Sequence, residues 1–402
     1  MATPSPSAAG PLTGVRVIEL GQLIAGPFCG KTLADFGAEV IKIEPPGKGD
    51  PLRKWRLLKN GNSVWWEVQS RNKQSVTLDL TQPEGQDVLR ALVKDADVLI
   101  ENFRPGKMEE WGLGYEDLKK INPKLVMARI SGYGQDGPYR DRPGFGIIAE
   151  SMGGLRYLTA EPGRVPVRVG VSIGDTLAAL HAVIGILMAL YHRDARGGVG
   201  QVIDIALYES VFNCMESLLP EYSAFGVVRE AAGSALPGIV PSNAYPCKDG
   251  WILIGGNGDG IFKRLMKAIG REDYAASPEM AGNDGRVKRV ADIDGAITAW
   301  TKSRDKATAL KILADHDVPS GAIYSIADIA ADAQYRAREM ILNIETHDGY
   351  KVDVPGIVPK LSATPGRIRS TAPRLGEDTA TVLEKAGLKP ENLADLRAKG
   401  VI

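Results

Sequence analysis

Apolar and polar residues alternate in blocks along the first half of the chain, and the blocks predict strands and helices in turn. Short runs rich in Val, Ile and Leu predict buried strands at residues 14–20, 38–44, 75–80, 96–102, 125–130 and 201–207. The segments between them predict helices at residues 26–36, 83–93 and 116–121, and another from Tyr208. Strands that alternate with helices form a parallel sheet, and ligands bind at the carboxyl ends of its strands. We therefore expect an α/β fold with a Rossmann-like parallel sheet.

An apolar stretch at residues 176–191 predicts one long helix. It is too short to cross a membrane comfortably, so a buried helix is the better interpretation. Asp175 stands at its head, where exposed amides and the helix dipole favour an ionised carboxylate. Gly174 leaves room there for another molecule to approach the backbone. The simplest explanation is that Asp175 caps the helix, and a catalytic carboxylate is the alternative.

The length of 402 residues exceeds a usual single core, so we expect two domains. A Gly-, Ala- and Pro-rich stretch near residues 226–242 marks the first boundary. The expected large domain spans residues 10–225 and is completed by 336–402, and a smaller α+β domain spans 226–335. Residues 1–9 lack the basic start and apolar stretch of a signal sequence, so we expect a flexible tail.

Composition narrows the possible partners. Lys and Arg together number 49, and so do Asp and Glu, so no net positive field draws nucleic acid or an anionic membrane. The three cysteines are scattered, which favours a reducing cytoplasm over a disulfide framework. The four histidines are far apart and show no metal-ligand spacing, so we expect no metal site.

Four polar or glycine-rich turns lie next to the predicted strands, at residues 26–27, 70–73, 102–106 and 131–134. We expect them to converge on one edge of the parallel sheet, where backbone amides and Lys or Arg side chains hold phosphates. Four such turns in series favour a phosphate-bearing ligand.

Two short motifs suggest other functions. Residues 132–137 fit GxGxxG after a strand, but Pro138 and the polar residues after it open no helix, so the dinucleotide fingerprint fails. Residues 170–174 fit GxSxG before a helix, which leaves a serine hydrolase with Ser172 as nucleophile open. That enzyme would also need a later carboxylate and a histidine.

The strands and turns together resemble the class III coenzyme A transferases, the CaiB/BaiF family that includes formyl-CoA:oxalate and carnitine CoA-transferases. The resemblance is strong from about Gly14 to Leu207 and looser beyond. The stretches that carry it are Leu12–Glu19, Ile24–Pro27, Gly37–Glu44, Asn72–Ser75, Glu101–Gly106, Gly112–Tyr115 and Ser131–Gly134. So many matches in one order are specific for the superfamily.

The resemblance implies an interlocked homodimer whose large domain is built from both ends of the chain. It also implies that Asp175 is the catalytic residue. The residues implied to contact coenzyme A (CoA) are Ile24, Ala25, Asn72, Lys73, Asn102, Phe103, Arg104, Gly132 and Tyr133. Ile24 and Pro45 replace a Gln and an Arg of the formyl-CoA enzymes, and their glycine-rich active-site loop is reduced to Gly233–Gly238. These departures disfavour oxalate as the substrate.

The implied activity is transfer of CoA from an acyl-CoA to a carboxylic acid through an aspartyl-CoA thioester. Arg140, Arg142 and Arg168 lie near the expected site in sequence and are candidates to grip a second carboxylate. Gly233 and Gly238 are candidates for a flexible lid over the substrate. We therefore expect a dicarboxylic substrate pair that includes succinyl-CoA.

There are two alternatives to a transferase, of which the racemase shares this fold. An α-methylacyl-CoA racemase of the family carries a His-Asp pair for proton exchange, but the matching segment here is Gly144–Ile147, and Phe145 cannot exchange a proton. A non-catalytic CoA-binding subunit would have no use for Asp175. The sequence thus favours a cytoplasmic transferase over both.

Overall fold

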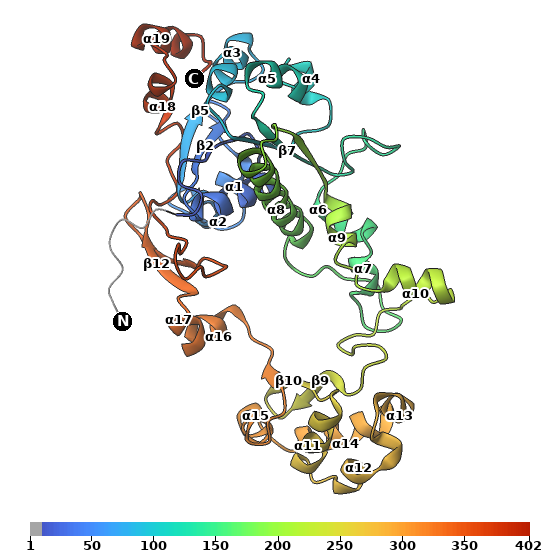
Figure 1. Cartoon of the computed structure of the whole chain (residues 1–402). Coiled ribbons are helices and arrows are strands. Elements are labelled where there is room, and N and C mark those ends of the chain that lie inside the picture. The colour runs from blue at the N-terminus through green and yellow to red at the C-terminus, as the bar shows by residue number, and fades with distance from the viewer. Residues whose placement is uncertain (1–9) are drawn as a thin grey trace. The chain divides into compact units, whose positions relative to one another are not determined.

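The computed structural model describes residues 10–402, so the expected tail at residues 1–9 lies outside the described part. The chain divides into two compact units (Figure 1). The first unit comprises the described residues up to Leu155, Val169–Phe225 and Arg336–Ile402, and the second comprises Arg156–Arg168 and Gly226–Tyr335.

One segment departs from the expected division. Residues 156–168 were assigned to the large domain, but they group with the second unit. The reason is local hydrogen bonding: Tyr157 donates to the carboxylate of Glu230, and the backbone amide of Gly233 donates to Ala160.

The first unit contains a six-stranded sheet in which all neighbouring strands are parallel. Its strands are β1 (Arg16–Glu19), β2 (Glu39–Glu44), β5 (Lys73–Thr77), β6 (Val98–Glu101), β7 (Val126–Ser131) and β8 (Val202–Ala206). The order β5-β2-β1-β6-β7-β8 reverses direction between β1 and β6. The Rossmann-like α/β prediction is therefore confirmed, and the reversal point is where such sheets bind ligands.

Helices cover both faces of this sheet. On one face, strand residues such as Ile18, Ile41 and Leu99 form an apolar core, mainly with four helices. These helices are α3 (Pro83–Val93), α5 (Tyr115–Ile121), α18 (Thr379–Lys385) and α19 (Pro390–Ala398). The opposite face is covered by α1 (Ala25–Asp35) and α8 (Ile173–Ala195), which lie side by side (Figure 1). The C-terminal segment therefore completes the core that the N-terminal half begins.

Helix α8 is buried along one side and exposed along the other. One side packs on β7, β8 and α1. The other side leaves a row of apolar side chains exposed, namely Leu180, Ile184, Leu187, Met188 and Tyr191. By length and composition alone α8 also qualifies as a membrane span, with a mean hydropathy of 1.9, but its packing on the sheet makes it a part of the first unit. The expectation of a buried helix therefore holds for one side of α8 only.

The first unit has smaller elements around the sheet. They are the 3-10 helix η1 (Pro51–Lys54), the hairpins β3 (Leu58–Lys59) with β4 (Asn62–Ser63) and β12 (Ile341–Glu345) with β13 (Lys351–Pro355), and the helices α2 (Val64–Gln69), α4 (Lys107–Glu110), α6 (Gly146–Met152), α9 (Leu207–Phe212) and α10 (Leu218–Phe225). Two short helices, α7 (Leu155–Leu158) and α17 (Ala333–Ala337), lie at the boundaries between the units.

The second unit is an α+β structure around its own apolar core. An antiparallel sheet joins β9 (Ser242–Cys247), β10 (Gly250–Gly255) and β11 (Ser320–Ala322). Its other elements are α11 (Asp259–Ala268), α12 (Glu272–Ala276), η2 (Pro278–Met280), α13 (Asn283–Lys288), α14 (Val290–Lys302), α15 (Lys306–Asp315) and α16 (Ile326–Ala331).

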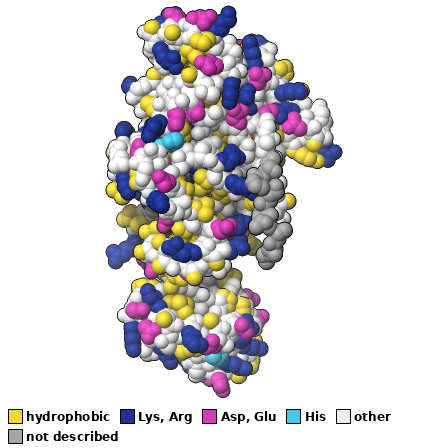
Figure 2. Space-filling model, turned by 90° about the vertical axis from the view of Figure 1, so that its left-hand side faces the viewer, with side chains coloured by type: hydrophobic (Ala, Val, Ile, Leu, Met, Phe, Trp, Pro, Cys, Tyr) yellow, Lys and Arg dark blue, Asp and Glu magenta, His cyan; other side chains and the backbone are white. Residues whose placement is uncertain are grey.

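Positive and negative side chains are interspersed on the surface that Figure 2 presents. This distribution agrees with the equal numbers of acidic and basic residues in the chain. The face in Figure 2 offers no large region of a single sign.

Candidate active site

Asp175 lies in the first turn of α8 but does not cap the helix. The N-cap is Ser172, so Asp175 is the third helical residue. Its half-buried carboxylate lies directly against Gly146, the first residue of α6. A Cβ atom on Gly146 would fall 1.9 Å from Oδ2 of Asp175. The carboxylate therefore occupies space that any other residue at position 146 would fill.

Close helix packing fixes this arrangement. Gly174 fits against the carbonyl oxygen of Gly146, and a Cβ atom added to Gly174 would lie 3.0 Å from that oxygen. Helices α6, α8 and α9 pack on one another around this contact. Because helix N-termini attract negative charge, the first turn of α8 favours an ionised Asp175. An ionised carboxylate held in place is suited to attack a carbonyl carbon.

A chain of contacts joins Asp175 to the carboxyl edge of the sheet. The loop after β7 begins with Gly132, whose backbone approaches Gly144 so closely that a Cβ atom on either residue would lie 2.9 Å from the other. The ring of Tyr133 also lies against Gly144, two residues before Gly146. The structure thus brings Gly132 and Tyr133 to the side of the sheet where α8 begins.

The loops after β1 and β6 meet at the reversal point of the sheet. The side chain of Asn102 accepts a hydrogen bond from the amide of Gln22 (2.8 Å) and donates one to its carbonyl (2.9 Å). Ile24 is the N-cap of α1, and Ala25 is its first residue. These hydrogen bonds join the loop after β1 to the loop after β6, and we call the two joined loops the rim. Gln22 belongs to the rim but was not among the residues expected from the sequence.

Two further expected residues lie on the β6 side of this rim. The amide of Phe103 donates to the carboxylate of Glu101 (2.7 Å), and its ring packs edge-on against Trp111 with centroids 5.4 Å apart. Arg104 is exposed next to it. Burial raises the pKa of Glu101 to about 7, although Arg129 and the Phe103 amide oppose that rise.

Asn72 precedes β5 and Lys73 is its first residue, so the backbone of both residues lies at the amino edge of the sheet. Asn72 donates to Asp35 (2.9 Å) and accepts from the amide of Arg369. Lys73 is buried with Glu19. The prediction that all four turns share one edge of the sheet is wrong for residues 70–73.

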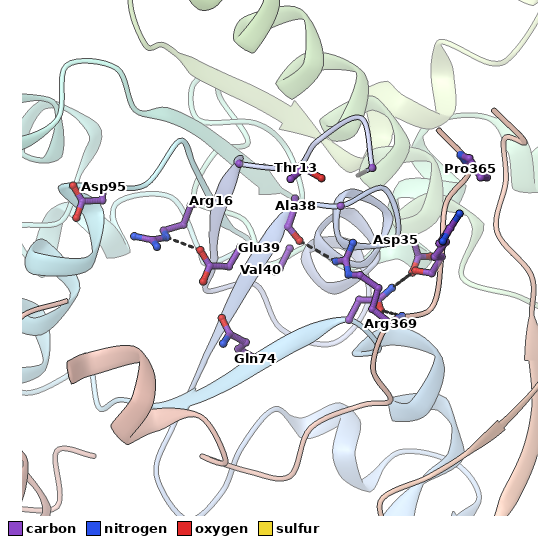
Figure 3. Close-up of a pocket in the computed structure, with 15 residues that line it drawn as sticks. Thr13, Arg16, Asp35, Ala38, Glu39, Val40, Gln74, Asp95, Pro365 and Arg369 are labelled. Carbon is purple, nitrogen blue, oxygen red and sulfur yellow. Dashed lines mark hydrogen bonds and ion pairs between the residues drawn. The ribbon is translucent and has the colours of Figure 1, made fainter. Parts of the chain in front are cut away.

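A cavity of about 690 Å³ lies at this opposite, amino edge (Figure 3). Arg16 and Glu39 form an ion pair on one side of it, and Arg369 donates to the carbonyl oxygen of Ala38 on another. Asn72 also lines it. The cavity contains no residue of the Asp175 contact chain.

The residues expected to bind the acid are divided between the two units. The guanidinium of Arg140 lies near Gly106 in the β6 loop. Arg142 stacks on Tyr139 at 3.7 Å, and the ring of Tyr139 is 5.9 Å from that of Tyr133. The remaining candidates, Arg168, Gly233 and Gly238, belong to the second unit.

The serine hydrolase interpretation fails on local structure. A nucleophile elbow places its serine between a strand and a helix. Ser172 precedes α8, but the element before it is the short helix α7, not a strand.

Comparisons with known proteins identify the family of the chain. The sequence model described as CoA-transferase family III matches residues 12–379. The chain belongs to CoA-transferase family III. This CoA-transferase is 48% identical to the succinyl-CoA–D-citramalate CoA-transferase of Chloroflexus aurantiacus, over 98% of both chains. It is 43% identical to the beta subunit of succinyl-CoA–L-malate CoA-transferase from the same organism, again over 98% of both chains.

A solved structure supports the same assignment. A CAIB/BAIF family protein from Brucella suis superposes with a TM-score of 0.83 at 36% identity, covering 94% of this chain and all of that one. The chain is therefore an enzyme of the CoA-transferase class, as the resemblance implied. Neither the racemase nor the non-catalytic subunit is needed to explain it.

Proposed function

We propose that this enzyme moves CoA from succinyl-CoA to a second dicarboxylic acid, with Asp175 as the covalent nucleophile. The relatives named above support the substrate class, because both act with succinyl-CoA and a short hydroxy-diacid. The observation that carries the role of Asp175 is its carboxylate, held against Gly146 at the head of α8. That position lies at the same sheet edge as the rim formed by Gln22 and Asn102.

The proposed reaction begins when a carboxylate oxygen of Asp175 attacks the thioester carbonyl of succinyl-CoA. The C–S bond breaks, which leaves an aspartyl–succinyl anhydride and CoA thiolate. The thiolate then attacks the aspartyl carbonyl, releases succinate and leaves an aspartyl-CoA thioester. No proton and no external energy source are required in these steps.

The acceptor repeats the sequence in reverse. Its carboxylate attacks the aspartyl-CoA carbonyl and expels CoA thiolate, which forms a second anhydride. The thiolate attacks the acceptor carbonyl of that anhydride, which yields the new acyl-CoA and restores Asp175. Water would hydrolyse either anhydride, so the site must exclude it. Gly233 and Gly238, both at positive φ in a turn-rich loop, remain the candidates for a cover.

The second carboxylate of the diacid needs a cation. Arg142 is the stronger candidate of the first unit, because Tyr139 and Tyr133 connect it to Gly144 and hence to the Asp175 contact chain. Arg140 lies near Gly106 in the loop after β6, on the side where we propose that CoA binds. The residues proposed to contact CoA are Ile24, Ala25, Asn102, Phe103, Arg104, Gly132 and Tyr133.

We further propose that the enzyme is a cytoplasmic homodimer. The exposed apolar row on α8 supports a second copy of the chain as its cover, because soluble proteins rarely leave large contiguous apolar patches in water. Interlocking of the two copies follows the family resemblance. Sedimentation velocity measures the oligomeric state directly, and a monomer at micromolar concentration would contradict the proposal.

Substitution of the nucleophile tests the reaction. Asp175→Ala should abolish transfer from succinyl-CoA to citramalate or malate while leaving the oligomeric state and CoA binding unchanged. Asp194→Ala, at the other end of α8, is the matched control and should keep full activity. Substantial transfer by Asp175→Ala would overturn the assignment.

A further inference from the structure

Four buried charges lie beneath the loop that joins β1 to α1. They are Glu19, Lys42, Asp50 and Lys73, each at most 3% exposed. The ammonium of Lys42 lies 2.7 Å from Oδ2 of Asp50 and 3.2 Å from Oε1 of Glu19. The ammonium of Lys73 lies 2.7 Å from Oε2 of Glu19. We call these four residues, two carboxyl and two amino side chains, the buried charge cluster.

Stability alone does not explain the buried charge cluster. Removing charges from water is costly, and apolar side chains of similar size often stabilise a core as well or better. On the other face of the same strands the buried side chains are apolar, among them Ile18, Ile41 and Val76. The charges must therefore be understood from the other groups they contact.

Those groups belong to the backbone of the β1–α1 loop and of the first turn of α1. Lys42 donates to the carbonyl oxygen of Gly21, and Lys73 donates to that of Pro27 at 2.8 Å. The carboxylate of Asp50 accepts from the amide of Leu23 at 3.1 Å. The buried charge cluster thus holds the loop at Gly21 and Leu23 and the first turn of α1 at Pro27.

The central point of attachment is conformationally unusual. Leu23 has a φ of 64°, in the left-handed region that residues with side chains seldom adopt. The next two residues are Ile24 and Ala25, which begin α1 and are proposed to contact CoA. The hydrogen bond from Leu23 to Asp50 therefore secures an unfavourable backbone conformation immediately before the proposed ligand contacts.

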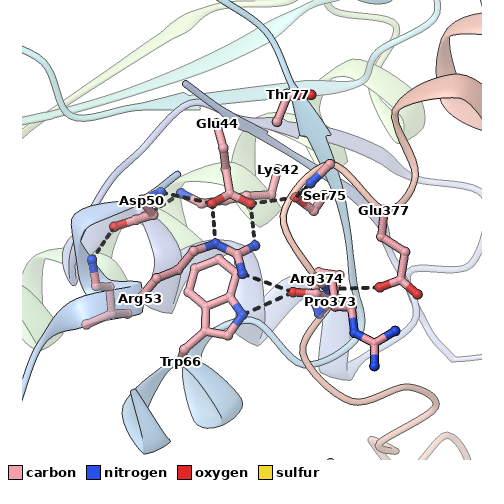
Figure 4. A network of polar contacts seen from close by, with 12 residues as sticks. Lys42, Glu44, Asp50, Arg53, Trp66, Ser75, Thr77, Pro373, Arg374 and Glu377 are labelled. Atoms are coloured by element: carbon pink, nitrogen blue, oxygen red, sulfur yellow. Dashed lines mark hydrogen bonds and ion pairs between the residues drawn. The ribbon is translucent and has the colours of Figure 1, made fainter. Parts of the chain in front are cut away.

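A hydrogen bond to a neighbouring charged residue also holds the backbone of Asp50 in place (Figure 4). Its amide donates to Oε2 of Glu44 at 2.9 Å, and two hydrogen bonds of 2.7 Å join Glu44 to Arg53. Burial opposes charge on Lys42, but Asp50 and Glu19 outweigh it and raise the pKa of Lys42. Burial likewise opposes charge on Asp50, but Lys42 outweighs it and lowers the pKa of Asp50. Both groups are therefore charged at neutral pH.

We propose that Asp50 and Lys42 are positioning residues for the acyl-CoA site: they hold Leu23 in its left-handed conformation so that Ile24 and Ala25 are set in place for the ligand. This inference rests on the proposed function, because it assumes that the β1–α1 loop receives acyl-CoA. Neither residue touches the reacting atoms. Their loss should weaken binding of acyl-CoA far more than it slows the chemical steps.

The test is a KM-against-kcat comparison for Asp50→Ala. This change removes the acceptor of the Leu23 amide, and it should raise KM for succinyl-CoA about 10- to 100-fold, since small misplacements of a binding loop have effects of that order. The value of kcat should change by less than about threefold, as expected for lost ground-state binding. If the alanine variant does not fold, Asp50→Asn replaces it in the test. This variant keeps an acceptor oxygen, so we expect a smaller rise in KM.

A second substitution separates positioning from general destabilisation. Glycine adopts the left-handed conformation without a side-chain penalty, so Leu23→Gly in the Asp50→Ala background should lower KM again by roughly fivefold or more. Arg286→Met removes a fully buried charge from the second unit and is the control for lost stability. It should lower the melting temperature without raising KM.

Calorimetric titration of acyl-CoA into Asp175→Ala protein, with and without Asp50→Ala, completes the test. Weaker binding with Asp50→Ala, rescued by Leu23→Gly, supports the positioning role. Equal binding in both proteins, or no rescue, overturns it. If the protein with intact Asp50 binds no acyl-CoA, the proposed function itself fails, and this outcome is distinct from the other two.

Discussion

The two faces of the six-stranded sheet are built from the same strands but differ in chemistry. Towards α3, α5, α18 and α19 the strands present Ile18, Ile41 and Leu99, all in an apolar core. Towards α1 the alternate positions present buried charges, among them Glu19 and Lys42. Because successive strand residues point to opposite faces, a single strand supplies both environments.

The difference separates two tasks within one sheet. The apolar face buries hydrocarbon, which stabilises the fold without regard to direction. The charged face forms directional hydrogen bonds, and its partners include the loop after β1. We infer that the first face supplies stability and that the second places the ligand-binding rim.

The largest effect is expected from a substitution in the apolar face of the sheet. Leu99→Ala should lower the free energy of unfolding by about 2–5 kcal/mol, because it leaves a cavity in a fully buried core. KM for succinyl-CoA should stay within about twofold of the unchanged enzyme, provided that the assay is run well below the melting temperature. Urea unfolding and steady-state kinetics measure the two quantities. A large rise in KM would contradict the division between the faces.

The next effect concerns the position of Asp175, the proposed nucleophile. Gly146→Ala places a methyl group where Oδ2 of Asp175 lies, so the carboxylate must move. We expect kcat to fall roughly 100-fold, with KM for acyl-CoA little changed. Gly295→Ala adds the same methyl group into open space in the second unit and is the control. An active Gly146→Ala enzyme would show that the observed carboxylate position is not required.

The smallest effect is a pH dependence of stability. Burial, with a contribution from Asp348, raises the pKa of Glu67 to about 7, whereas burial of Glu44 is outweighed by Arg53, which lowers the pKa of Glu44. A raised carboxyl pKa means that the contribution of Glu67 is fully present below its unfolded value and is lost as pH rises through about 7. Glu44 has the opposite sign, and its contribution is lost as pH falls. Glu67→Gln should therefore reduce the decline in melting temperature between about pH 5 and pH 8. An unchanged slope would contradict this ionisation pattern.

Much of the fold follows from the sequence because apolar periodicity is local. All six strands of the sheet were predicted within a few residues, and α3 was predicted with its observed bounds. The turn at residues 70–73 was misplaced, because it precedes its strand and was grouped with turns that follow theirs. In a parallel sheet a turn before a strand lies at the amino edge, opposite the turns that follow the strands.

The proposed site was anticipated only in part. Asp175, Asn102 and Tyr133 were named as candidates through the family resemblance, but Gly146 and Asp50 were not. Their roles depend on contacts between segments far apart in sequence: 29 positions separate Gly146 from Asp175, and 27 separate Leu23 from Asp50. One signal was available, since Glu19, Lys42 and Glu44 interrupt strands that are otherwise apolar. Charges at alternate positions of a central strand indicate a buried polar face.

Direct detection of the covalent intermediate tests the central claim. The enzyme is mixed with succinyl-CoA, quenched with hydroxylamine and digested, and the peptide containing Asp175 is examined by mass spectrometry. We expect a hydroxamate on Asp175 that disappears when succinyl-CoA is omitted. A modified residue elsewhere, or no modification in an enzyme that still transfers CoA, would contradict the account.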